Sequence, residues 1–132
     1  MKEVVEFLKA NPVGALATVE GGKARVRPFQ FMYEDGGALW FCTSTKKKVY
    51  AQLKASPQVE FLASSGTTWL RVAGEVAFSD ELAKKERVIA SSELVRSIYK
   101  EAANPVFAVF KIERGTAVLS DFSGKEPRTW SF

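Results

Sequence analysis

Short apolar runs rich in β-branched and aromatic residues, joined by glycine-containing turns, constrain the fold of this sequence more than any other feature. The run from Val13 to Thr18 is followed by Gly21-Gly22 and then by KARVRPFQFMYE, a pattern that predicts a β-hairpin. Asp35-Gly36-Gly37 then turns the chain into ALWFCT. Three successive strands joined by short turns favour an antiparallel meander in the N-terminal half.

Further strand patterns follow the same rule in the rest of the chain: QVEFLAS, TTWLRVAGEVAF, VFAVFKIE and TAVLSDF. They predict two more hairpins, which turn at Ser65-Gly66 and at Arg114-Gly115. Gly74 lies inside one of these runs, where a glycine often marks a bulge or a sharp bend. The polar tail SGKEPRTWSF follows the last predicted strand.

Helical patterns lie before and between the hairpins. Apolar residues at helical spacing predict a helix from Lys2 to Ala10, which Asn11-Pro12 ends. Three more helical stretches are predicted: 46–56, ELAKKERVIA with Ser79-Asp80 as its cap, and SELVRSIYKEAA. Because strands and helices do not alternate regularly, we expect an α+β fold, a six- or seven-stranded antiparallel barrel with peripheral helices.

Length and composition restrict the kind of protein this is. A chain of 132 residues is expected to form a single domain, residues 1–132, with one core. No apolar run approaches the length of a membrane span, and acidic residues in MKEVVEFLKANP argue against a secretion signal. The single cysteine, Cys42, excludes an internal disulfide and favours a reducing cytoplasm.

The sequence contains no histidine. This absence removes the usual general base, the histidine-paired nucleophiles and most zinc or haem sites. We therefore expect no metal site and no side chain that carries catalysis alone. An enzyme with this sequence would depend on a cofactor for its chemistry.

The positive charge is concentrated in one segment. Residues 21–59 carry seven cations and two anions, whereas the rest of the chain carries twelve cations and thirteen anions. A localised basic field indicates an anionic partner, either a phosphorylated small molecule or a nucleic acid.

Lys46, Lys47 and Lys48 are placed at the predicted start of a helix, where the macrodipole disfavours cations. Ser44 or Thr45 would serve as the N-cap. A bound phosphate would make the arrangement favourable, because hydroxyl, N–H and ammonium groups would all converge on its oxygens. A solvated lysine face is the alternative interpretation.

The predicted second strand offers further donors. Its period of two places Arg25, Arg27 and Phe29 on one face and the residues between them on the other. Pro28 has no N–H, so this strand is expected at a sheet edge or at a bulge, with backbone groups free to meet a flat polar ligand. Arginine offers a forked donor that suits phosphate, although Arg25 and Arg27 could also be ordinary solvent-facing residues.

Three stretches in order, GALATVEGGKARVRPFQF, ALWFCTSTKKKVYAQLKASPQVEFL and TWLRVAGEV, resemble the FMN-binding split-barrel proteins related to pyridoxamine 5'-phosphate oxidase. The resemblance spans roughly Val13 to Val76, and the closing strands are compatible with it. It implies a split β-barrel and a homodimer with two FMN sites at the subunit interface.

The resemblance also implies a set of site residues. Arg27 is the expected phosphate ligand, with Arg25 as a second candidate, and the cradle would be completed by Thr43, Ser44, Lys47 and Lys48. The flavin ring would face the backbone of Pro28, Phe29 and Gln30, within reach of Gln52, and would meet Trp69 and Arg71 of the partner subunit. Trp69 could instead be a core residue, and Arg71 could pair with a carboxylate.

The chain departs from the oxidase itself, which uses a C-terminal arginine and histidine, so oxidation of pyridoxamine phosphate is disfavoured. The histidine of the nitroimidazole-resistance members is also missing. The leading hypothesis is an FMN flavoprotein, either a reductase of an unidentified small molecule or an electron carrier. No glycine-rich dinucleotide motif is present, so a nicotinamide donor would bind only transiently. Trp130 could cover the flavin or simply pack.

Two other classes remain. A barrel that binds single-stranded nucleic acid could use Arg25, Arg27, Phe29 and Trp69 as basic and stacking groups. The clustering of cations near one strand-to-helix junction, and the acidic remainder of the chain, make nucleic acid the weaker hypothesis. A structural dimer without a cofactor is the third possibility.

Overall fold

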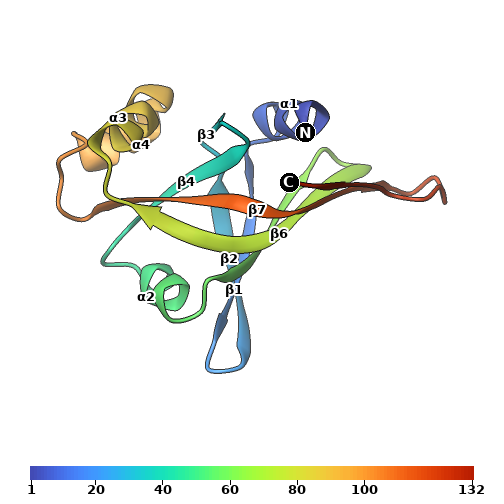
Figure 1. Cartoon of the computed structure of the whole chain (residues 1–132), viewed down its shortest axis with the longest axis horizontal. Helices are drawn as coiled ribbons and strands as arrows, with labels where there is room; N and C mark the ends of the chain where they lie inside the picture. The colour runs from blue at the N-terminus through green and yellow to red at the C-terminus, as the bar shows by residue number, and fades with distance from the viewer.

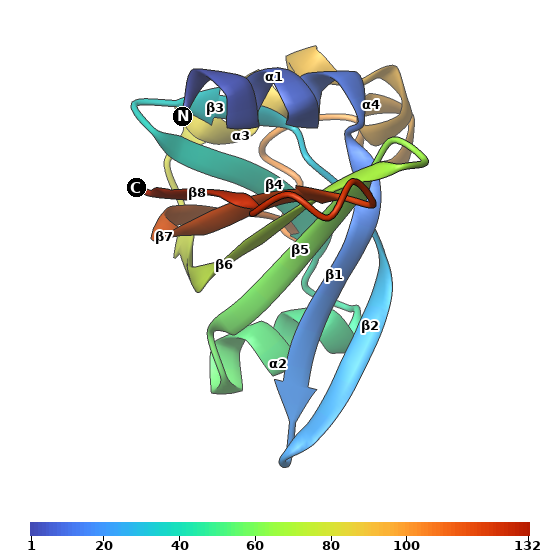
Figure 2. The ribbon, with the colours of Figure 1, turned by 90° about the vertical axis from the view of Figure 1, so that its right-hand side faces the viewer.

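The computed structural model describes all 132 residues. The elements in chain order are α1 (Lys2–Ala10), β1 (Val13–Glu20), β2 (Lys23–Gln30), β3 (Tyr33–Asp35), β4 (Ala38–Ser44), α2 (Lys48–Ala55), β5 (Gln58–Ser64), β6 (Thr68–Ser79), α3 (Leu82–Ser91), α4 (Glu93–Tyr99), β7 (Phe107–Asp121) and β8 (Arg128–Ser131). All strands join one antiparallel sheet in the order β2-β1-β5-β6-β7-β4-β3, and β8 pairs with β7 beside this path (Figure 1 and Figure 2).

The sheet curls so that its two ends approach each other. The ring of Phe29 on β2 lies 6.2 Å from that of Phe41 on β4 and 5.7 Å from that of Phe110 on β7, although β2 is at the far end of the strand order. No hydrogen-bonded ladder joins β2 to β3 or β4, so the barrel stays open along this line (Figure 2). The α+β split-barrel prediction is confirmed, with eight strands in place of six or seven.

The predicted meander of the first three strands is wrong. The hairpins β1–β2 and β3–β4 form as expected, but β2 and β4 do not pair. KARVRPFQFMYE is interrupted at Phe31 and Met32, whose N–H groups donate to Pro12 O and Trp40 O respectively. The chain crosses here from β2, at one end of the strand order, to β3 at the other end, and Phe31 in the crossing is buried in the core.

The closing hairpin is also wrong, because β7 runs without a break through Arg114-Gly115. Gly115 serves a close approach, not a turn: a Cβ atom there would lie 2.2 Å from the carbonyl oxygen of Ala73 on β6. Part of the polar tail, Arg128–Ser131, forms a further strand, β8, which the sequence pattern does not predict. The bulge predicted at Gly74 is confirmed by a register shift between Gly74 and Val76.

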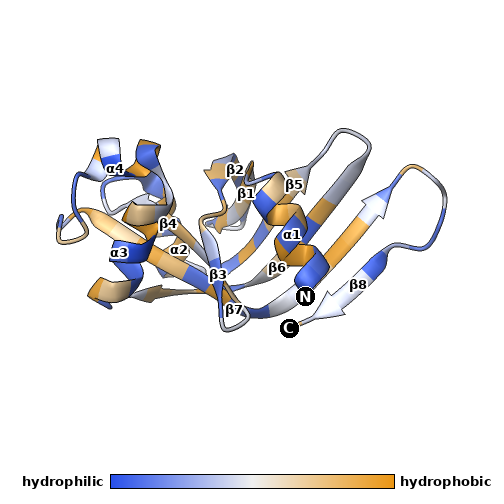
Figure 3. Ribbon diagram, turned by 90° about the horizontal axis from the view of Figure 1, so that it is seen from above, coloured by the Kyte–Doolittle hydropathy of each residue, from blue (hydrophilic) through white to orange (hydrophobic).

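The main core fills the inside of the curl, and two helices cover its ends. The helix predicted from Lys2 to Ala10 forms with those bounds and packs Val4 and Leu8 against the core. α2 contributes Val49 and Leu53 from the opposite end (Figure 2). α3 and α4 lie at one end of the molecule and the β7–β8 loop at the other (Figure 3). None of the helices is long and apolar enough to cross a membrane.

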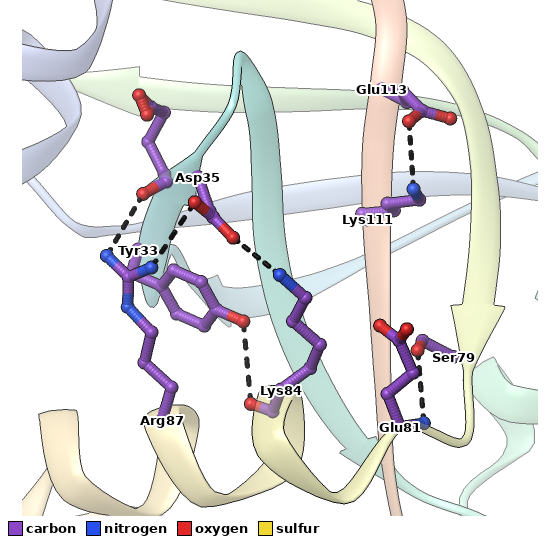
Figure 4. A network of polar contacts seen from close by, with 9 residues as sticks. Tyr33, Asp35, Ser79, Glu81, Lys84, Arg87, Lys111 and Glu113 are labelled. Carbon is purple, nitrogen blue, oxygen red and sulfur yellow. Dashed lines mark hydrogen bonds and ion pairs between the residues drawn. The ribbon is translucent and has the colours of Figure 1, made fainter.

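A polar network ties α3 to the β3–β4 hairpin. Asp35 accepts from Lys84 Nζ at 2.5 Å and pairs with Arg87 at 3.6 Å, and the Arg87 guanidinium lies 4.2 Å from the centre of the Tyr33 ring (Figure 4). The hydrogen bond from Lys84 lowers the pKa of Asp35 below its ordinary value of 3.8. These contacts, together with a second apolar cluster, fix α3 and α4 on the sheet.

The predicted cap of α3 is wrong. Glu81 is the N-cap residue, and Ser79 Oγ accepts from the N–H of Glu81 at 3.3 Å, before the helix begins. By contrast, α4 begins with a side-chain cap, because Ser92 Oγ accepts from the N–H of Val95 at 3.2 Å.

Candidate functional site

Two clefts meet at Lys47, beside the gap in the barrel. The first, which we call the basic cleft, has a volume of about 470 Å³ and is lined by Glu20, Arg25, Val26, Arg27, Lys47, Lys48, Val49 and Gln52. The second, the apolar cleft, has a volume of about 310 Å³ and is lined by Val13, Pro28, Phe29, Gln30, Met32, Cys42, Thr43, Lys47, Leu94, Val95, Ile98 and Tyr99.

Arg27 is held in place by the barrel interior. Its register places it beside the buried Leu16, on the core side of the sheet. Nη1 donates to Leu16 O at 3.0 Å and to Thr18 Oγ1 at 2.8 Å, and Nη2 donates to Gln52 Oε1 at 2.5 Å. A guanidinium has five N–H donors, so Nε–H and one Nη2–H remain unpaired. Partial burial lowers the pKa of Arg27, but a guanidinium stays charged at neutral pH.

Gln52 and Glu20 continue this network. The buried Gln52 accepts from Thr18 Oγ1 at 2.6 Å and donates from Nε2 to Glu20 Oε2 at 3.3 Å. Glu20 Oε1 also accepts from Arg25 Nε at 3.2 Å. The hydrogen bonds from Arg25 and then Gln52 lower the pKa of Glu20, so its carboxylate is charged at neutral pH. The basic cleft therefore holds four cations and one anion.

Glu20 is a site residue that the sequence did not indicate, because an anion site is expected to contain cations. A usable signal existed, because the period of two in β1 places Glu20 on the same face as Thr18. In the register, Thr18 lies opposite Arg25.

The start of α2 differs from the prediction. The helix begins at Lys48 with Lys47 at the N-cap position, so only one of the three lysines lies in the first turn, and no side chain caps it. Ser44 is not the cap: its Oγ accepts from the N–H of Lys46 at 3.2 Å, within a turn closed by Lys47 N–H and Ser44 O. Lys47 and Lys48 line the basic cleft, whereas Ser44 and Lys46 line neither cleft.

The apolar cleft brings β2 and β4 together across the gap. Pro28 lies on a strand at the end of the sheet, as predicted, and Phe29 and Gln30 follow it along the cleft. Thr43 faces them from β4; it is 2% exposed, and its Oγ1 has no hydrogen-bond partner. A buried hydroxyl without a partner is rare, so this atom is suited to a ligand. Cys42 is beside it, and burial raises the pKa of its thiol to about 12.

Three of the proposed residues lie elsewhere. Trp69 packs against Phe122 with ring centres 4.8 Å apart, and Arg71 pairs with Glu60 at 3.8 Å, both on β6 and outside the two clefts. Their role across a subunit interface stays a prediction. Trp130, on β8, packs against the main core.

The arrangement suits a ligand that carries both an anionic group and a flat ring. The basic cleft offers unpaired charged donors, and the neighbouring cleft offers apolar walls with a few polar atoms. Lys47 lines both clefts, so the basic and the apolar linings are adjacent at this residue.

The sequence model of the family described as "Pyridoxamine 5'-phosphate oxidase" matches residues 1–118. A NimC/NimA family protein from Clostridium acetobutylicum has 32% identity and a TM-score of 0.90, over 100% of this chain and 93% of that one. No curated protein matches the sequence.

Two more distant structures share the fold. A pyridoxamine 5'-phosphate oxidase-related, FMN binding protein from Nostoc punctiforme has 18% identity and a TM-score of 0.73, over 99% of this chain and 95% of that one. A heme binding protein from Mycobacterium smegmatis has 18% identity and a TM-score of 0.77, over 98% of this chain and 56% of that one. Because the family match spans nearly the whole sequence, the chain belongs to the FMN-binding split-barrel family related to pyridoxamine 5'-phosphate oxidase.

Proposed function

We propose that this protein binds FMN and acts as a flavin-dependent oxidoreductase on a small molecule. The phosphate would occupy the basic cleft and the flavin ring the apolar cleft. The observation that supports this most is that Arg27 and Lys47, which are remote in sequence, line the basic cleft together, and that Lys47 also lines the apolar cleft.

The residues of the basic cleft fit a phosphate. Arg27 keeps two unpaired N–H donors, and each charge-assisted bond to a phosphate oxygen contributes on the order of 1.5–3 kcal/mol. Lys47 and Lys48 add positive charge at the start of a helix without a side-chain cap. Gln52 acts through Arg27, because its Oε1 fixes the guanidinium.

The residues of the apolar cleft fit a flavin ring. The ring has a polar edge, and the unpartnered hydroxyl of Thr43 and the amide of Gln30 are available for hydrogen bonds to such an edge. Pro28 and Phe29 supply apolar contact. Thr43 was expected in the phosphate cradle, but it lines the apolar cleft, which we assign to the flavin ring, and not the basic cleft.

FMN, when bound, supplies the transfer of electrons or hydride, and the protein supplies binding, orientation and a shielded environment. The chain offers few groups for proton transfer in the apolar cleft. The Cys42 thiol is neutral at physiological pH because burial raises its pKa to about 12. An electron carrier with no organic substrate is the alternative within this proposal.

We also propose a homodimer, formed through the outer face of β1, β2 and β5. On this face Val26 is 70% exposed and Leu62 is 40% exposed. Their partners in the strand register are the small residues Ala17 and Ala15 of β1. Pro28, which lines the apolar cleft, is on the same face. A second copy seated here would border the cleft, and Trp69 and Arg71 of one copy could then approach the flavin of the other.

The test is to purify the protein and titrate it with FMN, riboflavin and haem, following flavin fluorescence and the haem Soret band. We expect one FMN per chain and FMN bound far more tightly than riboflavin. Tight haem binding without flavin binding would replace FMN by haem, and no binding of either would reject a cofactor role. Light scattering tests the dimer, which Val26→Glu should dissociate.

Nucleic acid remains the weaker candidate. Arg25, Arg27, Lys47 and Lys48 line one cleft, an arrangement that suits a single phosphate better than the extended backbone of a polyanion. Salt-sensitive binding of oligonucleotides that FMN does not displace would favour it instead. The free thiol of Cys42 is compatible with a reducing compartment, and we propose a cytoplasmic location.

A further inference from the structure

We propose that the flavin site acts on an uncharged, apolar ring compound without a phosphate, and that Leu94 and Ile98 of α4 form the wall against which it binds. This inference rests on the proposed FMN function. It concerns the side of the apolar cleft formed by α4, which no sequence motif indicated.

α4 presents an apolar stripe to the cleft. Leu94 is 62% and Ile98 58% exposed, and the two are one helical turn apart. Val95 and Tyr99, one position further along each, are buried and line the same cleft. Large exposed apolar side chains grouped in a cleft typically mark a binding surface, whereas scattered ones do not.

The stripe is held in a fixed position. Ser92 caps α4, and the Tyr99 ring packs on Phe107 of β7 with centres 4.7 Å apart. Val95 and Tyr99 belong to the second apolar cluster, which also contains Trp40 and Val88. The exposed pair is therefore carried by a packed helix, and its exposure shows that the cleft is open along α4.

The charges of the lining define the class of substrate. The apolar cleft contains no arginine, aspartate or glutamate, and its one cation, Lys47, also lines the basic cleft. A substrate with its own phosphate would therefore compete for the cations that the FMN phosphate requires. The polar atoms left for a substrate are those of uncharged groups, such as the Tyr99 hydroxyl.

The size of the cleft favours a small molecule. Its volume of about 310 Å³ is at the lower end of the range for ligand pockets, and the flavin ring would occupy part of it, so only a small substrate would fit beside the ring. β2 and α4 supply separate walls, so a ring held against Pro28–Gln30 leaves the α4 wall for a second ring.

The experiment measures binding of two matched probes to the FMN-loaded protein by equilibrium dialysis. α-Naphthol is uncharged at neutral pH, and α-naphthyl phosphate carries the same ring with a phosphate. We expect α-naphthol to bind at one per chain and the phosphate ester at least about tenfold more weakly. The double variant Leu94→Ser/Ile98→Ser should weaken α-naphthol binding by about tenfold or more, because it removes the apolar contact.

Leu82→Ser is the matched control, since Leu82 is an apolar helix residue with 51% exposure that lines neither cleft. It should leave the affinity for α-naphthol within about twofold of the wild type. Because Leu94 and Ile98 line the cleft proposed for the flavin ring, FMN occupancy is measured for every variant, and the affinities for the two probes are compared at one FMN per chain. The single variant Ile98→Ser gives the same test if the double variant does not fold.

Three results would overturn the inference while the FMN proposal stands: equal binding of both probes, no effect of the double variant, or full FMN binding with no α-naphthol binding. A change from dimer to monomer in the double variant, with unchanged probe affinity, would also overturn it, because the stripe would then be a subunit interface. Failure of the wild type to bind FMN would reject the proposed function itself.

Discussion

Arg27→Ala separates the phosphate from the flavin ring as sources of affinity. The guanidinium has two N–H donors without a partner in the protein, and both are free for a phosphate oxygen. Two charge-assisted bonds amount to roughly 3–6 kcal/mol, and the half-exposed position of Arg27 favours the lower value. A loss of about 3 kcal/mol corresponds to about a 100-fold weaker affinity for FMN.

The assay is fluorescence titration of FMN and riboflavin with the same protein preparations. Riboflavin has the same ring and ribityl chain but no phosphate, so its affinity should change by less than about threefold. Arg27→Ala also removes a donor from Gln52 and Thr18, so the thermal midpoint of each variant must be measured alongside. Arg114→Ala, an exposed arginine outside both clefts, is the matched control and should leave both affinities unchanged.

Arg27→Lys refines the test. A lysine keeps the charge but loses the forked donor pair, so we expect an FMN affinity between those of the wild type and Arg27→Ala. Equal losses of FMN and riboflavin affinity in Arg27→Ala would refute the reasoning. Arg27 would then stabilise the barrel interior, and the phosphate site would have to be sought elsewhere.

Other residues give sharp expectations. Glu20→Gln should raise the affinity for FMN several-fold and leave the affinity for riboflavin unchanged, because the variant removes a negative charge from the cleft proposed for the phosphate. Weaker FMN binding in titrations would contradict this. The Cys42 thiol, with a pKa of about 12, should react with iodoacetamide at roughly pH 8 far more slowly in the native protein than in urea, as mass spectrometry can show. The pKa of Asp35 is lowered, so its stabilising contribution is present above its unfolded pKa and is lost as the pH falls through the lower folded value. The thermal midpoint of the wild type should accordingly fall more steeply below roughly pH 4 than that of Asp35→Asn, and parallel curves would count against the pairing. Gly115→Ala should destabilise the fold by about 1–3 kcal/mol or more, since its Cβ would lie 2.2 Å from a carbonyl oxygen; an unchanged urea midpoint would show that the strands can separate.

Local features of the fold were predictable, and long-range pairing was not. Gly21 and Gly22 have φ values of +56° and +78°, as a tight hairpin turn requires, and the sequence identified that turn. Gly115 has a different role: a side chain there would clash with the backbone of β6, which lies close to it. A sequence pattern does not distinguish a glycine that allows a turn from one that allows two strands to touch, so a single long strand was interpreted as a hairpin.

The candidate site was predictable where each residue type matched the ligand chemistry in isolation. The four cations Arg25, Arg27, Lys47 and Lys48 line one cleft, and the neutral amide of Gln52 lines it with them. The α4 wall was not found, because apolar residues at helical spacing are usually part of a core. Its exposure depends on how the curled sheet ends beside the helix, which is a property of the tertiary structure alone.

Glu20 explains how a strongly basic cleft can be ordered before a phosphate arrives. Four cations in one cleft repel one another, and a carboxylate among them offsets part of that repulsion. The same carboxylate accepts from Gln52, whose oxygen in turn accepts from Arg27 and Thr18. The guanidinium is thereby fixed with its two unpaired donors in one orientation, so little side-chain entropy is left to lose on binding. Glu20 therefore opposes the phosphate through its charge and orders the site through its acceptor oxygens. Glu20→Gln keeps an amide oxygen as acceptor and removes only the charge, which is why tighter FMN binding is expected of it.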